Sequence, residues 1–208
     1  MSIEIWLTFV AASSALLMVP GPTILLVLSY AISKGRSVAL ATATGVALGD
    51  LIAMSASLAG LGALVLASAT VFTVLKWVGA AYLIYLGIKL FRSASDASLG
   101  NVEDVSGKGT LQIFGHATAV TALNPKSIVF FIAFVPQFIS VERPLWPQFV
   151  LLTATFVTLA ALNALAWALL GDKMRVFFKR PGALAWFSRF GGGALMAMGV
   201  ATVAMKRA

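Results

Sequence analysis

The sequence predicts an all-α integral membrane protein with about six transmembrane helices, arranged as a 3+3 inverted repeat in which helices 1 and 4 are broken. Of its 208 residues, 60% are hydrophobic and 11% are charged, whereas a soluble domain has roughly 25% charged residues. Prolines interrupt the apolar sequence at corresponding points, in Val19-Pro20-Gly21-Pro22 and Leu123-Asn124-Pro125-Lys126. A polar linker, residues 93–110, separates the two halves, which cover roughly residues 1–92 and 111–208.

Six apolar stretches are each long enough to cross a hydrocarbon core, which takes about 20 helical residues. The first runs past the length of a signal-peptide core and has no basic region before it, so we expect it to remain as a span. All six should form one transmembrane transporter domain, residues 1–208. The stretches are approximately residues 3–31, 38–67, 71–91, 111–139, 146–170 and 183–205.

The third and sixth stretches resemble each other, which supports a duplication. Because each half would hold three spans, the second half would enter the membrane from the opposite side. An alternative is that membrane helices are simply rich in glycine, since small residues allow helices to approach closely. Aligning residues 78–87 with 190–199 pairs Gly79 with Gly191, Leu83 with Leu195, and Gly87 with Gly199.

The two breaks are candidate binding elements. A proline removes a backbone donor and clashes with the preceding turn, and Pro22 suits the first turn of a new helix. The N-terminus of a half-helix presents free N–H groups and a partial positive charge, to which a carboxylate would bind well. A simple proline kink is the alternative. Matched breaks in two halves are typical of the binding site of a secondary transporter.

Asp50 and Lys126 are the expected charged residues of this site. Asp50 lies within the second span, where an ionised carboxylate costs about 2.5 to 3.5 kcal/mol, so it requires a partner or a function. Lys126 directly follows Asn124-Pro125 and is the expected partner, although its long side chain could instead extend to the membrane surface. Asp50 could also lie near a helix end or in a fixed pair. A buried carboxylate whose protonation responds to its surroundings suits proton coupling.

Four more polar side chains could hydrogen-bond a bound molecule. Each of them could equally join two helices or anchor the protein at the membrane interface. Asn163 is the strongest candidate, because its position in the second half corresponds closely to that of Asp50 in the first. The four residues are Tyr82, Tyr85, Gln137 and Asn163.

Composition argues against several other classes of protein. The net charge of +8 comes from basic residues between the spans, which are topology signals rather than a nucleic-acid surface. With no cysteine and only His116 as histidine, we expect no disulfide, no metal centre and no cofactor. An intramembrane enzyme would need a nucleophile with a base, paired carboxylates or a metal cluster.

Five motifs make the chain resemble the RhtB/LysE family of bacterial amino-acid exporters. The resemblance extends through most of the sequence. It implies a small inner-membrane protein that expels amino acids or close derivatives, driven by the proton motive force. The motifs are Pro20-Gly21-Pro22, Gly45-x-x-x-Gly49-Asp50, Gly79-x-x-Tyr82-Leu83-x-Tyr85-Leu86-Gly87, Leu123-Asn124-Pro125-Lys126 and Phe134-Val135-Pro136-Gln137-Phe138.

The charged residues at the breaks suit a zwitterion, with its carboxylate at a helix N-terminus or Lys126 and its ammonium at Asp50. A cationic side chain would meet Lys126 as a like charge, a repulsion of several kcal/mol at an effective dielectric constant of about 20. We therefore expect a neutral substrate similar to homoserine, threonine or leucine. The alternatives are export of basic amino acids, or of a metal or other ion, on the same architecture; an intramembrane enzyme is least favoured. A homodimer is also compatible with the sequence, since Gly45-x-x-x-Gly49 could bring helices together within or between subunits.

Basic residues are concentrated after the first, third and fifth spans. Cytoplasmic loops carry the excess of lysine and arginine, so the linker 93–110 should face the cytoplasm and both termini the periplasm. The basic residues on the cytoplasmic side are Lys34, Arg36, Lys89, Arg92, Lys108, Lys173, Arg175, Lys179, Arg180 and Arg189. Those on the other side are Lys76, Arg143, Lys206 and Arg207.

This topology can be tested with single cysteines, because the chain contains none of its own. Arg175→Cys should be protected from a membrane-impermeant maleimide in intact cells and should react after the membrane is opened. Arg143→Cys, on the predicted periplasmic side, should react in intact cells and serves as the control. Labelling of position 175 in intact cells would refute the orientation.

Overall fold

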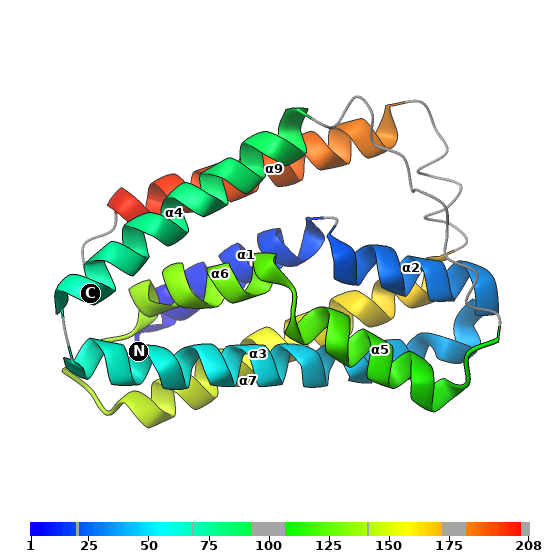
Figure 1. The fold of residues 1–208 in the computed structure, drawn as a ribbon, viewed down its shortest axis with the longest axis horizontal. Helices are drawn as coiled ribbons and strands as arrows, with labels where there is room; N and C mark the ends of the chain where they lie inside the picture. The colour runs from blue at the N-terminus through cyan, green and yellow to red at the C-terminus, as the bar shows by residue number, and fades with distance from the viewer. Residues whose placement is uncertain (20, 68, 93–106, 141, 172–181, 205–208) are drawn as a thin grey trace.

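The computed structural model describes the chain except for residues 20, 68, 93–106, 141, 172–181 and 205–208. The described part is helical and contains no strand. Helices occupy all six apolar stretches, and most of them run roughly along one long axis (Figure 1). They are α1 (Ile3–Met18), α2 (Pro22–Lys34), the short η1 (Gly35–Val38), α3 (Ala39–Ala67), α4 (Ala69–Arg92), α5 (Thr110–Ala122), α6 (Pro125–Ala133), the short η3 (Val135–Phe138), α7 (Leu145–Leu169) and α9 (Ala183–Ala204).

Helices end at both predicted breaks. α1 ends at Met18, and Gly21 is extended (φ −140°, ψ −176°) before Pro22 begins α2. In the second half, Asn124 is extended (φ −69°, ψ 110°) before Pro125 begins α6. The residue before a proline disfavours the α conformation, whereas proline itself fits the first helical position. The bend between α5 and the α6–η3 segment is 45°.

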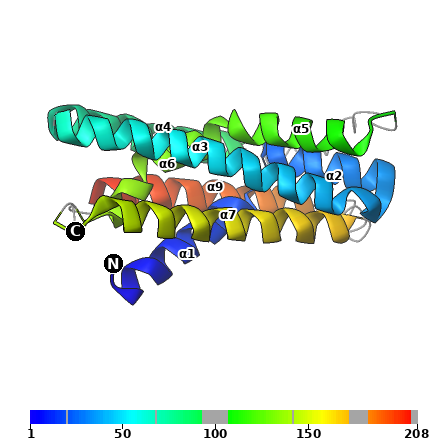
Figure 2. The same ribbon diagram turned by 90° about the horizontal axis from the view of Figure 1, so that it is seen from below.

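By length and hydropathy, the described helices provide two membrane spans, or three if one bent pair counts as a span. Two described helical stretches are long and apolar enough to cross a membrane, Pro22–Gly60 and Leu145–Leu169, and the bent pair Thr110–Ala122 with Pro125–Phe138 makes a third if it counts as one span. α1 is apolar but has only 16 residues, short of the about 20 that a span needs. Six spans therefore stay a prediction. Figure 2 shows α1 running obliquely to the other helices.

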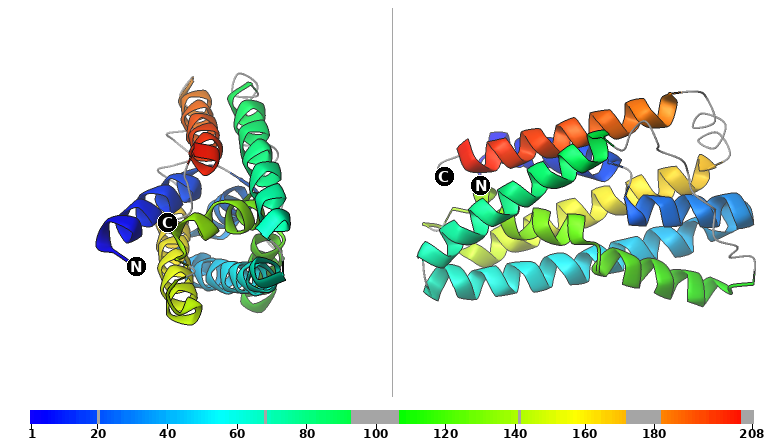
Figure 3. Two further views of the ribbon diagram at one scale, coloured as in Figure 1. Left: turned by 90° about the vertical axis from the view of Figure 1, so that its left-hand side faces the viewer. Right: turned by 45° about the horizontal axis from the view of Figure 1, so that its top comes forward.

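α4 and α9 lie side by side along one edge of the molecule (Figure 3). Their contact is built on glycines: a Cβ on Gly87 would lie 2.6 Å from the Gly192 carbonyl oxygen, and one on Gly199 would lie 2.6 Å from Ile84 Cγ1. Gly87 and Gly199 are the residues that the alignment of the halves pairs, and each faces the other's helix. This reciprocity supports the proposed inverted repeat.

A second aligned pair of glycines faces the two broken helices. A Cβ on Gly79 of α4 would overlap with Ala133 Cβ of α6, and one on Gly191 of α9 would lie 3.1 Å from Val19 Cγ2, just after α1. Each half thus packs a glycine against the broken helix of the other half. Because these positions have no side chain, the third helix of each half can approach the break of the opposite half.

The Gly45-x-x-x-Gly49 spacing joins two helices of the same chain. A Cβ on Gly45 would lie 2.6 Å from the Phe114 carbonyl oxygen, and one on Gly49 would lie 2.7 Å from the Thr118 carbonyl oxygen. α3 therefore packs closely on α5 through both glycines. This contact places Asp50, the residue after Gly49, beside the end of α5 that leads into the second break.

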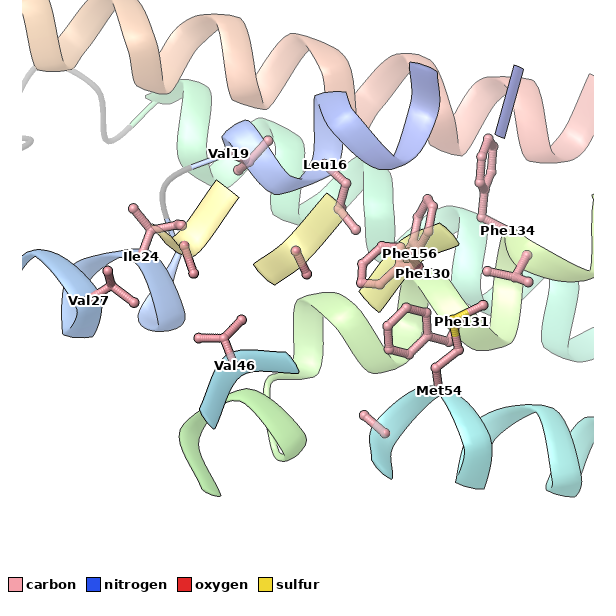
Figure 4. Packing of buried hydrophobic residues seen from close by; sticks show 14 of the residues in the cluster. Leu16, Val19, Ile24, Val27, Val46, Met54, Phe130, Phe131, Phe134 and Phe156 are labelled. Carbon is pink, nitrogen blue, oxygen red and sulfur yellow. The ribbon is translucent and has the colours of Figure 1, made fainter. Parts of the chain in front are cut away.

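An aromatic cluster holds α6 against α7 (Figure 4). Phe131 and Phe156 meet edge-on with ring centroids 4.8 Å apart, and Phe130 stacks on Phe134 with centroids 5.1 Å apart. All four rings are buried. In a membrane, such packing stabilises by close contact rather than by release of water. It fixes α6, and with it the position of Lys126 in the first turn.

Gly199→Ala should destabilise the α4–α9 contact, whereas Gly193→Ala in the same helix should not. The new methyl group at position 199 would meet the Ala80 carbonyl oxygen at 2.8 Å, but nothing lies within 4 Å of a Cβ at position 193. Overpacking costs about 1 to 3 kcal/mol, while glycine to alanine in an open helical position gains up to about 1 kcal/mol. Thermal unfolding in detergent measures both variants. Equal melting temperatures would contradict the packing described.

Candidate functional site

Lys126 caps the helix that ends at the opposite break. Its Nζ donates to the backbone oxygens of Leu16, at 3.1 Å, and Val19, at 2.9 Å. The last carbonyls of a helix have no partner within the helix and carry a partial negative charge. An ammonium group from α6 therefore satisfies the C-terminal end of α1.

Asn163 supplies a second cap from α7. Its Nδ2 donates to the Leu17 carbonyl oxygen at 3.2 Å, and its Oδ1 accepts from Trp167 Nε1 at 3.2 Å. The indole bond fixes which way the amide faces. Two side chains from the second half thus bind three carbonyl oxygens at the end of α1, those of Leu16, Leu17 and Val19.

Asn124 organises the second break. Its Oδ1 accepts from the Lys126 backbone N–H at 3.1 Å, so that it caps the N-terminus of α6. Its Nδ2 donates to Thr23 Oγ1 at 3.1 Å, and Thr23 Oγ1 lies 3.3 Å from Thr121 Oγ1. This chain of hydrogen bonds joins α2, α5 and α6 where both helices are interrupted.

The N-terminus of α2 has no comparable cap. Gly21 precedes Pro22 and offers no side chain to the first N–H groups of the helix. A Cβ at Gly21 would lie 3.4 Å from Lys126 Nζ and 3.6 Å from its Cε. The ammonium of Lys126 therefore lies beside the first break, within reach of the segment between α1 and α2.

Asp50 lies in α3 at the edge of this centre. Its side chain is 2% exposed, and its Oδ1 has no hydrogen-bond partner in the described part of the chain. A Cβ on neighbouring Gly49 would lie 2.7 Å from Thr121 Cβ and 3.0 Å from the Ala122 backbone nitrogen, at the end of α5. Asp50 is thus close to the second break, as Asn163 is to the first.

Asp50 and Lys126 interact electrostatically. These two described residues form no direct ion pair, and Lys126 Nζ donates instead to the carbonyl oxygens of Leu16 and Val19. The sequence left open whether Asp50 and Lys126 pair directly, and in this structure they do not. The expectation that Lys126 points inward, toward the break and not toward the surface, is correct.

The other predicted residues divide into two groups. Pro22 and Pro125 begin the second half-helices of the centre, while Pro20 lies outside the described residues. Tyr82 is part of α4, half-buried, with its ring centroid 6.1 Å from that of exposed Tyr85, and it forms no hydrogen bond to the centre within the described ranges. Buried Gln137 donates to the Ala133 carbonyl oxygen at 3.4 Å, away from both breaks.

Sequence reasoning missed several members of the centre. The sequence analysis did not predict Thr23, in the first turn after Pro22, or Thr121 as members of the centre. A hydroxyl beside a helix break would have indicated both. The carbonyl oxygens at the end of α1 could not be identified from side chains. Their role follows only from the position of Lys126.

The fold and the site define a helical membrane protein with a polar centre between two broken helices. The family model described as LysE type translocator matches residues 14–206, and the chain belongs to this family. It is 31% identical over 208 residues to the homoserine/homoserine lactone efflux protein of Salmonella typhimurium. The matched residues are 100% of this chain and 100% of the relative. No solved structure matches the chain.

Two further relatives extend the comparison. A leucine efflux protein of Salmonella choleraesuis is 33% identical over 138 residues, which are 66% of this chain and 64% of the relative. A Vibrio cholerae protein named as an uncharacterized membrane protein is 30% identical over 200 residues, covering 96% of this chain and 97% of the relative.

Asn124→Ala should destabilise the protein more than Asn124→Ser. Both changes lose the bond to Thr23, but serine can still cap α6, and loss of an N-cap costs about 1 kcal/mol. Thr23→Val serves as the matched control, since it removes the bond from the other side and leaves the cap intact. The order of melting temperatures in detergent tests this account, and it fails if the alanine variant is as stable as the serine variant.

Proposed function

We propose that this protein is a secondary transporter that exports neutral amino acids or close derivatives from the cytoplasm across the bacterial inner membrane, coupled to protons. Its membership of the LysE family and the printed names of two relatives support amino-acid efflux. The observation that carries the proposal is the polar centre, where two broken helices meet one buried acid and one lysine. Its proposed residues are Pro20, Gly21, Pro22, Asp50, Tyr82, Asn124, Pro125, Lys126 and Asn163.

The chemistry of the relatives' named substrates supports recognition of an ammonium group. Homoserine carries an ammonium and a carboxylate, whereas its lactone keeps the ammonium and replaces the carboxylate with an uncharged ester. A site that accepts both must gain much of its binding from the shared ammonium. The centre supplies suitable acceptors in the carbonyl oxygens at the end of α1 and in Asp50.

Charge balance favours a neutral side chain on the substrate. Asp50 is the one acid that the described residues place at the centre, because Glu4 lies in the first turn of α1 and Glu142 between η3 and α7. Lys126 already balances Asp50, and the carbonyl oxygens at the end of α1 can bind one substrate ammonium. A cationic side chain would be a further positive charge without a partner in a medium of low dielectric constant. Leucine-, threonine- and homoserine-like substrates avoid this cost, whereas lysine and arginine do not.

Asp50 is the proposed proton-coupling group. A buried carboxylate with an unpaired oxygen can gain or lose a proton as the charges around it change. We propose that the coupling follows from movement of an ammonium group toward or away from this carboxylate. The membrane arrangement in this proposal is a 3+3 inverted repeat with both termini in the periplasm.

Proteoliposomes containing the purified protein test both the substrate selectivity and the proton coupling. Labelled homoserine and leucine should be exported faster with a pH gradient than without one, and arginine should not compete. Asp50→Asn should fold and insert but lose the stimulation by the gradient, whereas Glu142→Gln, a matched change at an exposed position, should retain it. Export of arginine as fast as leucine would refute the selectivity, and unchanged gradient dependence in Asp50→Asn would refute the role of Asp50.

A further inference from the structure

The group that caps α1 is chemically the same as the group that an amino-acid substrate presents. A lysine side chain ends in a primary ammonium with three donors and no acceptor, and the α-ammonium of an amino acid has the same charge and the same donors. Lys126 Nζ uses two of these donors on the Leu16 and Val19 carbonyl oxygens, at 3.1 and 2.9 Å. The end of α1 is therefore a preformed ammonium site that the chain itself fills.

The surroundings of the Leu16 and Val19 carbonyl oxygens favour an ammonium group. The Leu17 carbonyl oxygen, one of the two that lie between them in the sequence, accepts from Asn163 Nδ2 at 3.2 Å. The helix end contributes a partial negative charge, which attracts a cation. Gly21 lies beside this ammonium, because a Cβ at position 21 would be 3.4 Å from Nζ. As a glycine, it places no side chain there.

A second acceptor is available to Lys126 if it leaves these carbonyls. Asp50 is buried, its Oδ1 has no partner among the described residues, and it already interacts electrostatically with Lys126. The lysine side chain has four methylene groups and can change rotamer without movement of α6. Lys126 therefore has two alternative sets of acceptors, of which the structure shows one occupied.

We propose that the Leu16 and Val19 carbonyl oxygens form the substrate's ammonium subsite, and that Lys126 is a tethered competitor which substrate displaces toward Asp50. This inference rests on the proposed function and deepens it. In the loaded site, Asp50 balances the ammonium of Lys126, and the substrate ammonium binds the end of α1. This revises the assignment of the substrate ammonium to Asp50 that the sequence alone suggested.

The competition lowers the apparent affinity for substrate by the fraction of time that Lys126 occupies the subsite. If the competent, vacant state is populated at about 1 to 10%, the apparent Kd is raised about 10- to 100-fold. Removal of the ammonium should remove this cost for any ligand that binds through its own ammonium. It should give no such gain to a ligand that has none.

Two homoserine derivatives separate the contribution of the substrate's ammonium to binding from that of its carboxylate. Homoserine lactone retains the ammonium without a carboxylate, and N-acetylhomoserine retains the carboxylate without an ammonium. Isothermal titration calorimetry on the purified full-length protein should show that Lys126→Met binds homoserine lactone about tenfold more tightly than the wild type, with no gain for N-acetylhomoserine. Lys89→Met, at an exposed position of α4, should change neither affinity.

A second variant at position 126 tests the same competition. Lys126→Gln, which lacks the charge but keeps an amide donor, should show a smaller gain and replaces Lys126→Met if the methionine variant does not fold. Equal or weaker binding of homoserine lactone in a folded variant would overturn the inference, as would an equal gain for both ligands. If the wild type neither binds nor exports homoserine or leucine, the proposed function itself fails, which is a distinguishable result.

Discussion

The hydrogen bonds from Lys126 to the end of α1 connect the two broken helices, and the rest of the structure depends on this contact. Backbone groups freed by a break cannot remain unpaired where water is excluded. At the end of α1 the Leu16 carbonyl oxygen accepts from the Val19 N–H, and the second break places an ammonium on the carbonyl oxygens of both Leu16 and Val19. Asn163 binds the Leu17 carbonyl from α7. The C-terminal end of α1, in the first half, is thus bound by side chains of the second half.

Packing outside this centre has a different character. Glycines bring α3 onto α5 and α4 onto α9 with no space for a side chain between them, and aromatic rings fix α6 against α7. Such contacts have one close-packed arrangement and resist gradual change. The ammonium at the breaks, by contrast, can exchange one set of oxygen acceptors for another. A rigid frame around a replaceable polar contact is what a binding site for a small charged molecule requires.

The sequence predicted the helices and their breaks well, because apolar length and proline act locally. It also identified Asp50, Asn124, Lys126 and Asn163 as polar residues that lie near the breaks. It did not predict the acceptor of Lys126, since a carbonyl oxygen is present at every residue and only the three-dimensional path of α1 makes these ones available. Tyr82 was predicted as a polar side chain that could hydrogen-bond a bound molecule, and the structure places it on α4 without a hydrogen bond to the centre among the described residues.

Solid-state NMR can test directly whether the Lys126 contact is exchangeable. The protein in lipid bilayers would carry ¹⁵Nζ-lysine and ¹³C-carbonyl valine, and the dipolar coupling between Lys126 Nζ and the Val19 carbonyl would be assigned by its loss in Lys126→Met. We expect a measurable coupling without substrate, consistent with the 2.9 Å contact to the Val19 oxygen, and its loss when homoserine lactone saturates the protein. A coupling that persists unchanged in substrate-saturated protein would show that Lys126 is a fixed cap and would contradict the account.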